Sequence, residues 1–429
     1  MILRPYQAQA LADLRATFAS GAKRVLFVCP TGGGKTVCAG EIIRSAVARG
    51  RRVAFVVRSR ALLAQGAGHL ARVGISAGVV AAGEASDPLL PVQVCSAQTL
   101  TSRGNAPPAD LLIWDEAHGI VAPTAKAIVE LYPRAHVIGL TATPERGDGA
   151  SLGDVFEVLV PVRATFAELV AAGALCPADV VGPSKRVDTL SADPAEAFRQ
   201  WSNAGQRKGV VFARDRAHSR DIAESLVALG VPTAYVDGET PADERARLFA
   251  ALASGELRCL TNCDLLTEGW DCPSIEVVVL ARGFSSASTY LQAVGRVLRA
   301  APGKTRALVV DLLGVTHTHG LPDEEREYSL TGRAIRPKET IEPIRQCGPC
   351  GAVFRSAVAC PRCGAVRAPD PPRVEVRTIE QINAVSTRTE RNEYLRELQS
   401  MARARGYHMK WVGVKFKEKY GAWPTRGVL

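Results

Sequence analysis

RVLFVCPTGGGKT, residues 24–36, is the stretch that decides the fold. It begins with a short apolar run that ends at Pro30, which predicts a buried strand. Three glycines follow, and Lys35 and Thr36 then open a segment with apolar residues at helical spacing as far as Arg49. A strand, a glycine-rich loop and a helix in this order predict the first unit of a parallel α/β sheet.

The loop between that strand and helix has the chemistry of a phosphate site. Glycines let backbone N–H groups approach phosphate oxygens, and the N-terminus of the next helix favours an anion. Phosphate loops of the strict pattern carry glycine where this chain has Cys29, but the flanking strand and helix supply the expected context. A merely flexible turn would leave Lys35 and Thr36 unexplained. We predict that Lys35 reaches the β- and γ-phosphates of ATP and that the Thr36 hydroxyl binds Mg²⁺. The predicted cradle is Thr31, Gly32, Gly33, Gly34, Lys35 and Thr36.

A second apolar run, LLIW at 111–114, ends in the carboxylates of Asp115 and Glu116. Ligands of a parallel sheet bind at the carboxyl ends of its strands, so we expect both acids beside the phosphate loop. We predict that Asp115 holds Mg²⁺, directly or through water, and that Glu116 orients or deprotonates the water that attacks the γ-phosphate. The positive species that faces this acid pair would then be Mg²⁺ bound to ATP.

Strand-like runs and helical patterns alternate from residue 24 to 145, and the alternation restarts at GVVFA, residues 209–213. Strands without polar residues are typical of a parallel sheet that helices cover on both faces. In the second set, Thr240 and Pro241 are expected to be the N-cap and the first residue of a helix. The sequence therefore predicts two α/β lobes of similar size.

Composition limits the class of protein. The chain has 429 residues, 47% of them hydrophobic, and a formal net charge of +10. The excess of positive charge fits a polyanionic partner such as DNA. No apolar run approaches the roughly 18 residues of a membrane span, and the N-terminus lacks the build of a signal peptide, so we expect a cytoplasmic protein without a membrane partner.

Four of the eleven cysteines are clustered in two C-x-x-C pairs, each followed by glycine. Each pair predicts a tight turn that aims two thiolates at one point, and four thiolates make a closed tetrahedral site for structural Zn²⁺. Disulfides, a redox pair or iron are the alternatives, and the paired spacing favours zinc. The predicted ligands are Cys347, Cys350, Cys360 and Cys363. Whether this zinc ribbon touches DNA or only packs on the second lobe is open.

The C-terminal tail is basic and aromatic. Glu418 is its only acid between Met401 and Leu429. Such a composition suits single-strand binding, with charges for phosphates and rings for stacking. The alternative, which we favour for Trp411, Phe416 and Tyr420, is a helical hairpin with these rings as its own core.

The ordered motifs resemble those of superfamily 2 helicases and translocases, over residues 1 to about 315. PTGGGKT and DEAH, residues 115–118, are similar to the two ATP-binding motifs of that family. The further matching stretches are RPYQ (4–7), VVRSRALLAQ (56–65), SAQTL (96–100), TAT (141–143), VVFARDRAHSRDIA (210–223), NCDLLTEGWDCP (262–273) and QAVGRVLR (292–299).

The resemblance implies RecA-like lobes and a role for each matched residue. Arg4 and Gln7 would contact the base, and Gly269 and Asp271 would lie near the ribose. His118, Thr141 and Thr143 would couple hydrolysis to strand binding. Gln292, Arg296 and Arg299 would act on the phosphates when the lobes close, where an arginine is worth about 10³–10⁵ in rate. The implied nucleic-acid contacts are Arg58, Ser59, Gln98, Thr99 and Thr267.

The predicted domains are an ATP-binding RecA-like lobe at 1–160, a second RecA-like lobe at 161–335, a zinc ribbon at 340–368 and a basic helical tail at 369–429. The ribbon and tail resemble those of bacterial and phage RadD-type repair helicases, which implies roles in recombination or replication repair and contact with single-strand-binding protein or recombinase. The expected DNA is single-stranded, forked or branched. QAVGRVLR differs from the HRxGRxGR of RNA-handling relatives, so we expect DNA. An ATP-switched recruitment factor and the motor subunit of a restriction complex are the alternatives.

Overall fold

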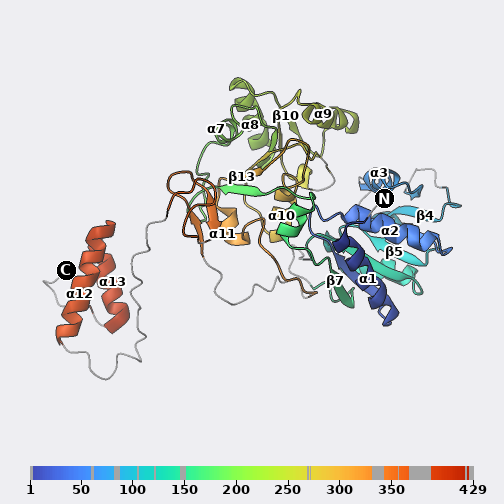
Figure 1. Ribbon diagram of the computed structural model, residues 1–429, viewed down its shortest axis with the longest axis horizontal. Coiled ribbons are helices and arrows are strands. Elements are labelled where there is room, and N and C mark those ends of the chain that lie inside the picture. Colours follow the sequence, from blue (N-terminus) through green and yellow to red (C-terminus); the bar gives the residue numbers. More distant parts are fainter. Residues whose placement is uncertain are drawn as a thin grey trace. The chain divides into compact units, whose positions relative to one another are not determined.

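The computed structural model describes residues 3–58, 62–81, 87–103, 106–119, 122–144, 151–267, 270, 272–330, 343–355, 357–366, 388–420 and 423–424. The chain forms two compact units, Met1–Val366 and Arg367–Leu429. The first unit holds two parallel sheets and a small ribbon, and the second holds two helices (Figure 1). The finer domain boundaries given above stay predictions.

The first sheet is parallel throughout, with strand order β3-β4-β2-β5-β6-β1-β7. Alternate residues of its central strands enter two different cores, because Val25 and Phe27 pack on one face and Leu26 and Val28 on the other. The strands are β1 (Arg24–Val28), β2 (Val53–Val57), β3 (Gly78–Val80), β4 (Val92–Ser96), β5 (Leu111–Trp114), β6 (His136–Thr141) and β7 (Val158–Pro161). The helices are α1 (Pro5–Ala19), α2 (Lys35–Val47), α3 (Leu63–Arg72), α4 (Ala97–Arg103) and α5 (Ala122–Leu131), with a 3₁₀ turn η2 (Ala117–Gly119).

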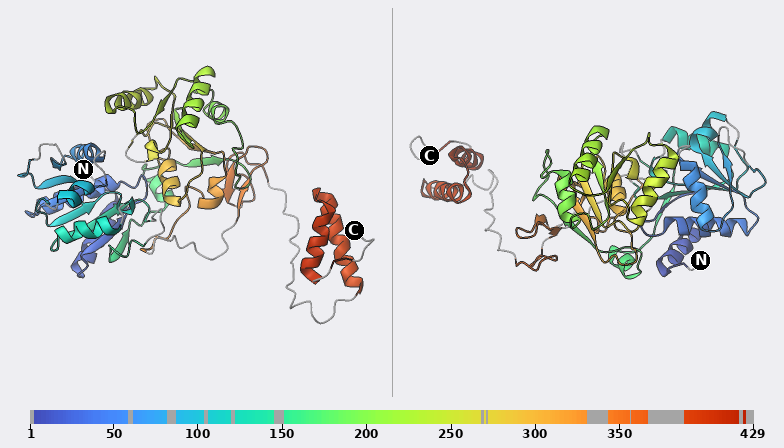
Figure 2. Two further views of the ribbon diagram at one scale, coloured as in Figure 1. Left: turned by 180° about the vertical axis from the view of Figure 1, so that it is seen from behind. Right: turned by 90° about the horizontal axis from the view of Figure 1, so that it is seen from above.

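The second sheet repeats this plan with order β10-β11-β9-β12-β13-β8, again parallel throughout. Helices cover both faces of the two sheets (Figure 2), so the prediction of two parallel-sheet α/β domains is confirmed. The strands are β8 (Ala178–Val181), β9 (Gly209–Ala213), β10 (Thr233–Val236), β11 (Cys259–Asn262), β12 (Val277–Ala281) and β13 (Ala307–Asp311). The helices are α6 (Phe166–Ala171), α7 (Pro194–Trp201), α8 (Arg216–Ala228), α9 (Ala242–Ser254), α10 (Ala287–Gly295) and α11 (Val315–His319), with a 3₁₀ turn η3 (Leu265–Thr267).

The predicted cap of α9 is wrong by one residue. Pro241 is the N-cap and the helix begins at Ala242. Thr240 is engaged one turn earlier, because its Oγ1 accepts from the Asp237 N–H at 3.0 Å while its own N–H donates to Asp237 Oδ1 at 3.0 Å. The aspartate turn therefore takes the hydroxyl that would have capped the helix.

The ribbon consists of the antiparallel strands β14 (Ile344–Gln346) and β15 (Val353–Arg355). It packs on the edge of the second sheet, where Ala352 forms an antiparallel bridge with Val181 of β8. Gln346 Nε2 donates to the Gly182 carbonyl at 2.6 Å, and an Arg355–Glu324 ion pair of 2.6 Å adds a polar contact. Packing on the second lobe is thus observed, whereas contact between the ribbon and DNA stays a prediction.

The second unit is a helical hairpin of α12 (Arg388–Arg405) and α13 (Met409–Tyr420). Its core includes Leu398, Val412 and Phe416, with Trp411 and Tyr420 partly buried against it. The interpretation that these aromatic rings serve the hairpin itself is confirmed. No helix in the described part of the chain is both long and apolar enough to cross a membrane.

Candidate functional site

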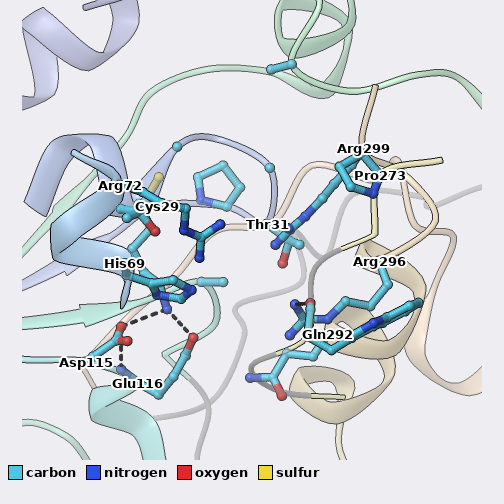
Figure 3. A pocket seen from close by; sticks show the side chains of 18 of the residues that line it. Cys29, Thr31, His69, Arg72, Asp115, Glu116, Pro273, Gln292, Arg296 and Arg299 are labelled. Carbon is cyan, nitrogen blue, oxygen red and sulfur yellow. Dashed lines mark hydrogen bonds and ion pairs between the residues drawn. The ribbon is translucent and has the colours of Figure 1, made fainter. Parts of the chain in front are cut away.

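A cleft of about 520 Å³ lies where the carboxyl ends of β1 and β5 face the second lobe. Figure 3 shows Asp115 and Glu116 on one side of the cleft and Gln292, Arg296 and Arg299 on the other. The predicted phosphate-loop residues that also line the cleft are Thr31, Gly32, Gly34, Lys35 and Thr36. The cleft therefore brings together residues that lie far apart in the chain, since Arg4 and Arg299 both line it.

The loop conformation requires glycine at two positions. Gly32 and Gly34 have φ of +81° and +91°, and a Cβ added at either would lie 2.2 Å from a neighbouring side-chain atom, of Leu175 and Gln7 respectively. Gln7 is buried, and its Nε2 donates to the Gly33 carbonyl at 2.9 Å. Gln7 thus contacts the loop from behind, and α2 begins directly at Lys35 with its N-terminus toward the cleft.

Lys35 forms ion pairs with both acids of the LLIWDEAH stretch. Its Nζ is 3.1 Å from Asp115 Oδ1, and it also contacts Glu116 Oε1. Burial alone would lower the pKa of Lys35, but the two carboxylates outweigh it and raise that pKa above its usual range. For Glu116 the directions are reversed. Burial alone would raise its pKa, but Lys35, followed by His118 and Arg296, holds that pKa below its usual range. Lys35 and Glu116 are therefore both charged at neutral pH.

The backbone at Glu116 is in an unusual conformation. Its φ is +49°, one of four positive values among the described residues other than glycine. Left-handed backbone is unfavourable for a residue with a Cβ and persists where surrounding contacts fix it, often at functional sites. Glu116 Oε1 contacts Lys35, which fixes this carboxylate at the end of β5, and its Oε2 lies 3.4 Å from His118 Nδ1.

His118 connects the two lobes by hydrogen bonds. Its Nδ1 is 3.0 Å from Thr141 Oγ1 on β6, and its Nε2 is 3.2 Å from the amide nitrogen of Gln292 on α10. The Gln292 amide nitrogen can only donate, so His118 Nε2 accepts and Nδ1 carries the proton. Thr141 Oγ1 then accepts from Nδ1 and donates to the Thr143 carbonyl at 2.7 Å. A hydrogen bond of 2.5 Å between Thr143 Oγ1 and Ser288 Oγ makes a second link to α10.

Arg296 and Arg299 enter the cleft from the second lobe. Arg296 Nη1 donates to the Trp270 carbonyl at 2.6 Å, and Arg299 lies in a backbone bridge with Leu175. The lobes touch beside these arginines, because a Cβ added at Gly295 would lie 2.3 Å from Thr31 Cγ2. The end of α10, from which both arginines follow, thus packs against the phosphate loop.

The remaining predicted residues are distributed as follows. Arg4 and Arg58 line the same cleft, and Arg4 Nη2 donates to the Gly173 carbonyl at 3.4 Å. On α4, Gln98 is exposed while Thr99 is buried, which keeps the Thr99 side chain off the surface where a nucleic-acid strand was expected. The predicted residues outside the described set are Ser59, Gly269 and Asp271, together with the side chain of Thr267.

Sequence reasoning missed part of the cleft wall. His69 and Arg72 line it from α3, at a spacing of three that places both on one side of that helix (Figure 3). The placement of α3 depends on packing, since Gly40 of α2 approaches the Val73 side chain and Arg44 Nη1 donates to the Val73 carbonyl at 3.1 Å. No local motif carries that information.

The four clustered cysteines form a second candidate site. All their sulfur atoms lie within 4.8 Å of one another, and the Cys347–Cys363 and Cys350–Cys360 sulfur atoms are 3.7 Å apart. Tetrahedral Zn²⁺ with bonds of about 2.3 Å places its sulfur ligands about 3.8 Å apart, whereas a disulfide needs about 2.05 Å. The turns of the two C-x-x-C pairs have the same hydrogen bond. The N–H groups of Gly351 and Gly364 each donate at 2.9 Å to the carbonyl of the first cysteine of their pair. This arrangement fits a tetrahedral metal ion.

Comparison with known proteins gives two family matches. The family described as "Type III restriction enzyme, res subunit" matches residues 1–146, and "Helicase conserved C-terminal domain" matches residues 194–301. A 51.5 kDa protein of Lactococcus phage (isolate 7-9) is 28% identical over 78% of this chain and 76% of its own length. The DNA 3'-5' helicase XPB of Kineococcus radiotolerans is 29% identical over 69% of this chain and 57% of its own length.

Among solved structures, a fragment of an HsdR subunit of a type I restriction enzyme from Vibrio vulnificus YJ016 is similar, with a TM-score of 0.61 and 22% identity. The match covers 78% of this chain and 70% of that one. At this identity the likeness shows the fold, and the chain spans only about half to three quarters of the lengths of the two relatives named above.

Proposed function

Because the chain belongs to the superfamily 2 helicases and carries both of their domains, we propose that it is a DNA-stimulated ATPase that moves on or remodels DNA. One observation carries the proposal: the cleft places Lys35, Asp115 and Glu116 of one lobe opposite Arg296 and Arg299 of the other. A cleft built this way can hold a triphosphate between an anchored loop and movable guanidinium groups.

Each side of the cleft has its own task in the proposed reaction. The loop and Lys35 bind the β- and γ-phosphates, and Glu116, kept ionised by its neighbours, orients and deprotonates the attacking water. Arg296 and Arg299 stabilise the charge that develops on the transferred phosphoryl group. Thr36 and Asp115 would hold Mg²⁺, which supplies charge neutralisation on the phosphate oxygens. Gln292 positions water or phosphate.

Movement would follow from the contact between the lobes. His118 and Thr141 lie on the first lobe and Gln292 on the second. ATP hydrolysis beside Glu116 therefore changes the surroundings of a hydrogen-bonded link between the two lobes. Opening and closing of the seam, which is the contact between the two lobes, shifts two surfaces that bind the nucleic-acid strand relative to each other. We place those surfaces at Arg58 and Gln98 on the first lobe and near Thr267 on the second.

DNA is the proposed strand. The bacterial relative is named a DNA 3'-5' helicase, and the formal net charge of +10 fits a grip on phosphates that is salt-sensitive and independent of sequence. The test is ATP turnover measured with single-stranded DNA, duplex, forks, Holliday junctions and RNA, with Lys35→Ala as the inactive control. Turnover that no DNA raises would contradict the proposal, and a larger response to RNA would redirect it.

A second candidate is the motor subunit of a restriction complex, which the first family match and the HsdR neighbour favour. Such a motor moves along duplex without separating it, so it displaces a triplex-forming oligonucleotide but leaves annealed strands paired. Displacement of an annealed strand supports the helicase. An ATP-switched recruitment factor would displace neither and would change only its affinity for DNA with ATP.

Zinc is the proposed metal of the four-cysteine site, in a structural role because four thiolates leave no open position. One zinc ion per chain in the purified protein, measured by elemental analysis, is the expected result. The finer likeness to RadD-type helicases, a cytoplasmic location and contacts with single-strand-binding protein or recombinase stay predictions.

A further inference from the structure

The helical hairpin carries an exposed surface that the ATP cleft does not use. We define the α13 stripe as Tyr407, Lys410, Val414, Lys417 and Trp423. Lys410, Val414 and Lys417 are spaced by four and three, which places them on one side of α13, and the core residues lie on the other side. Tyr407 and Val414 are each 43% exposed and Trp423 is 56% exposed. Among the described residues, Tyr407 and Trp423 are the aromatic members of the set of exposed large hydrophobic side chains.

Both rings are held in place. The Tyr407 ring centroid is 4.9 Å from that of Trp411, which packs on the hairpin core. Lys417 Nζ lies 5.2 Å from the centre of the Trp423 ring, and the following residue, Pro424, is buried. A ring already fixed in an exposed position loses little conformational freedom when a ligand stacks on it.

The segment of chain that carries the stripe is positive. Six basic residues and one acid lie between Arg403 and Pro424. That acid, Glu418, is bonded to Lys415 Nζ at 2.5 Å, so its charge is locally balanced. The stripe therefore presents two lysines and two rings with no free carboxylate in its own segment of the described chain.

We propose that the α13 stripe binds single-stranded nucleic acid, with Lys410 and Lys417 on phosphates and Tyr407 and Trp423 stacked on unpaired bases. Exposed rings beside lysines match this ligand, because each nucleotide offers one negative charge and one flat face. A duplex hides its base faces, and an acidic peptide supplies the charge without them. The inference goes beyond the proposed function, since it uses no residue of the cleft.

The test measures binding of labelled oligothymidylate, oligouridylate, duplex DNA and polyglutamate to the whole chain, without nucleotide and over a range of salt. Lys410→Ala/Lys417→Ala removes the two charges of the stripe. Arg396→Ala/Arg403→Ala is the matched control, because it removes two exposed charges from the outward side of α12. Trp423→Ala removes a ring, and Trp423→Phe keeps one.

We expect the lysine pair to reduce the slope of log affinity against log salt for oligothymidylate by about 1.4, at about 0.7 per phosphate contact. Trp423→Ala should weaken oligothymidylate binding by roughly 5- to 150-fold, with most of the affinity kept in Trp423→Phe. Oligouridylate binding should weaken in the same order of variants, because phosphates and unpaired base faces are common to both strands. Binding of duplex DNA should change less.

Equal loss from the α12 and α13 pairs would overturn the proposal, because net charge alone would then explain binding. Unchanged oligothymidylate binding in the α13 variants, or loss of polyglutamate binding instead, would overturn it too. ATP turnover without DNA should be the same in all variants. If stripe variants lose oligothymidylate binding while DNA fails to stimulate turnover of the wild type, this proposal stands and the proposed motor function fails.

Discussion

Gly295→Ala tests whether the seam between the lobes must close for ATP turnover. Gly295 is the last residue of α10, and a Cβ added there would lie 2.3 Å from Thr31 Cγ2 and 2.9 Å from Thr31 Cβ. Rotation about χ1 moves Cγ2 but leaves Cβ in place. Carbon atoms pack at about 3.5–4.0 Å, so even after that rotation the seam must widen by about 0.6–1 Å.

The expected loss is kinetic. Arg296 and Arg299 follow Gly295 closely in the chain and move away from the phosphates with it, and a misplacement of about 1 Å can cost about 10²-fold in rate. ATP affinity should change less, because Lys35 and the loop belong to the first lobe. Folding stability should not fall, since alanine is favoured over glycine in a helix by up to about 1 kcal/mol.

Steady-state phosphate release with saturating DNA, binding of a fluorescent ATP analogue and thermal unfolding separate these effects. Gly238→Ala is the matched control, because a Cβ there meets nothing within 4 Å. Thr31→Gly removes the obstructing side chain, so Thr31→Gly/Gly295→Ala should turn over ATP as fast as Thr31→Gly alone. Full turnover in the Gly295→Ala single variant would refute the closure argument.

The remaining predictions concern charge, coupling and metal. Glu116→Gln should bind ATP and DNA yet hydrolyse ATP at least about 10²-fold more slowly in phosphate-release assays, since the general base is lost; normal turnover would reject its assignment. Lys35→Ala should lose turnover and weaken binding of a fluorescent ATP analogue, and unchanged binding would exclude the phosphate contact. His118→Ala should keep turnover without DNA but lose its stimulation by DNA, because the link to the second lobe is cut. Cys360→Ser should lose zinc in elemental analysis and lower the melting temperature, whereas Cys263→Ser, outside the cluster, should do neither.

The limits of sequence reasoning about the fold lie at the sheet edges. Strands buried on both faces, such as β1 and β9, appear in the sequence as continuous apolar runs. Within the two large sheets, the strands that were not predicted, β3, β7 and β8, are all edge strands of three or four residues. An edge strand is short and partly exposed, as Val158 of β7 is, so its apolar signal is weak.

The site shows a similar division. Lys35, Asp115 and Glu116 are readable because each belongs to a local strand-and-loop pattern. The hydrogen bond of His118 to Gln292 joins residues 174 positions apart, and Gly295 and Thr31, which also meet, lie even farther apart in sequence. Such contacts depend on how the two lobes pack, and no short pattern encodes that.

The position of the ribbon links the proposed zinc site to the stability of the second lobe. β8 is an edge strand, and an uncovered edge offers unpaired backbone groups to other chains. The ribbon covers this edge through the bridge of Ala352 to Val181 and through the hydrogen bond that the Gly182 N–H donates to the Gly351 carbonyl. Gly351 and Ala352 directly follow the first cysteine pair, so the turn that a metal would fix is the turn that meets β8. Loss of the metal should therefore lower the unfolding temperature of the whole lobe and promote aggregation.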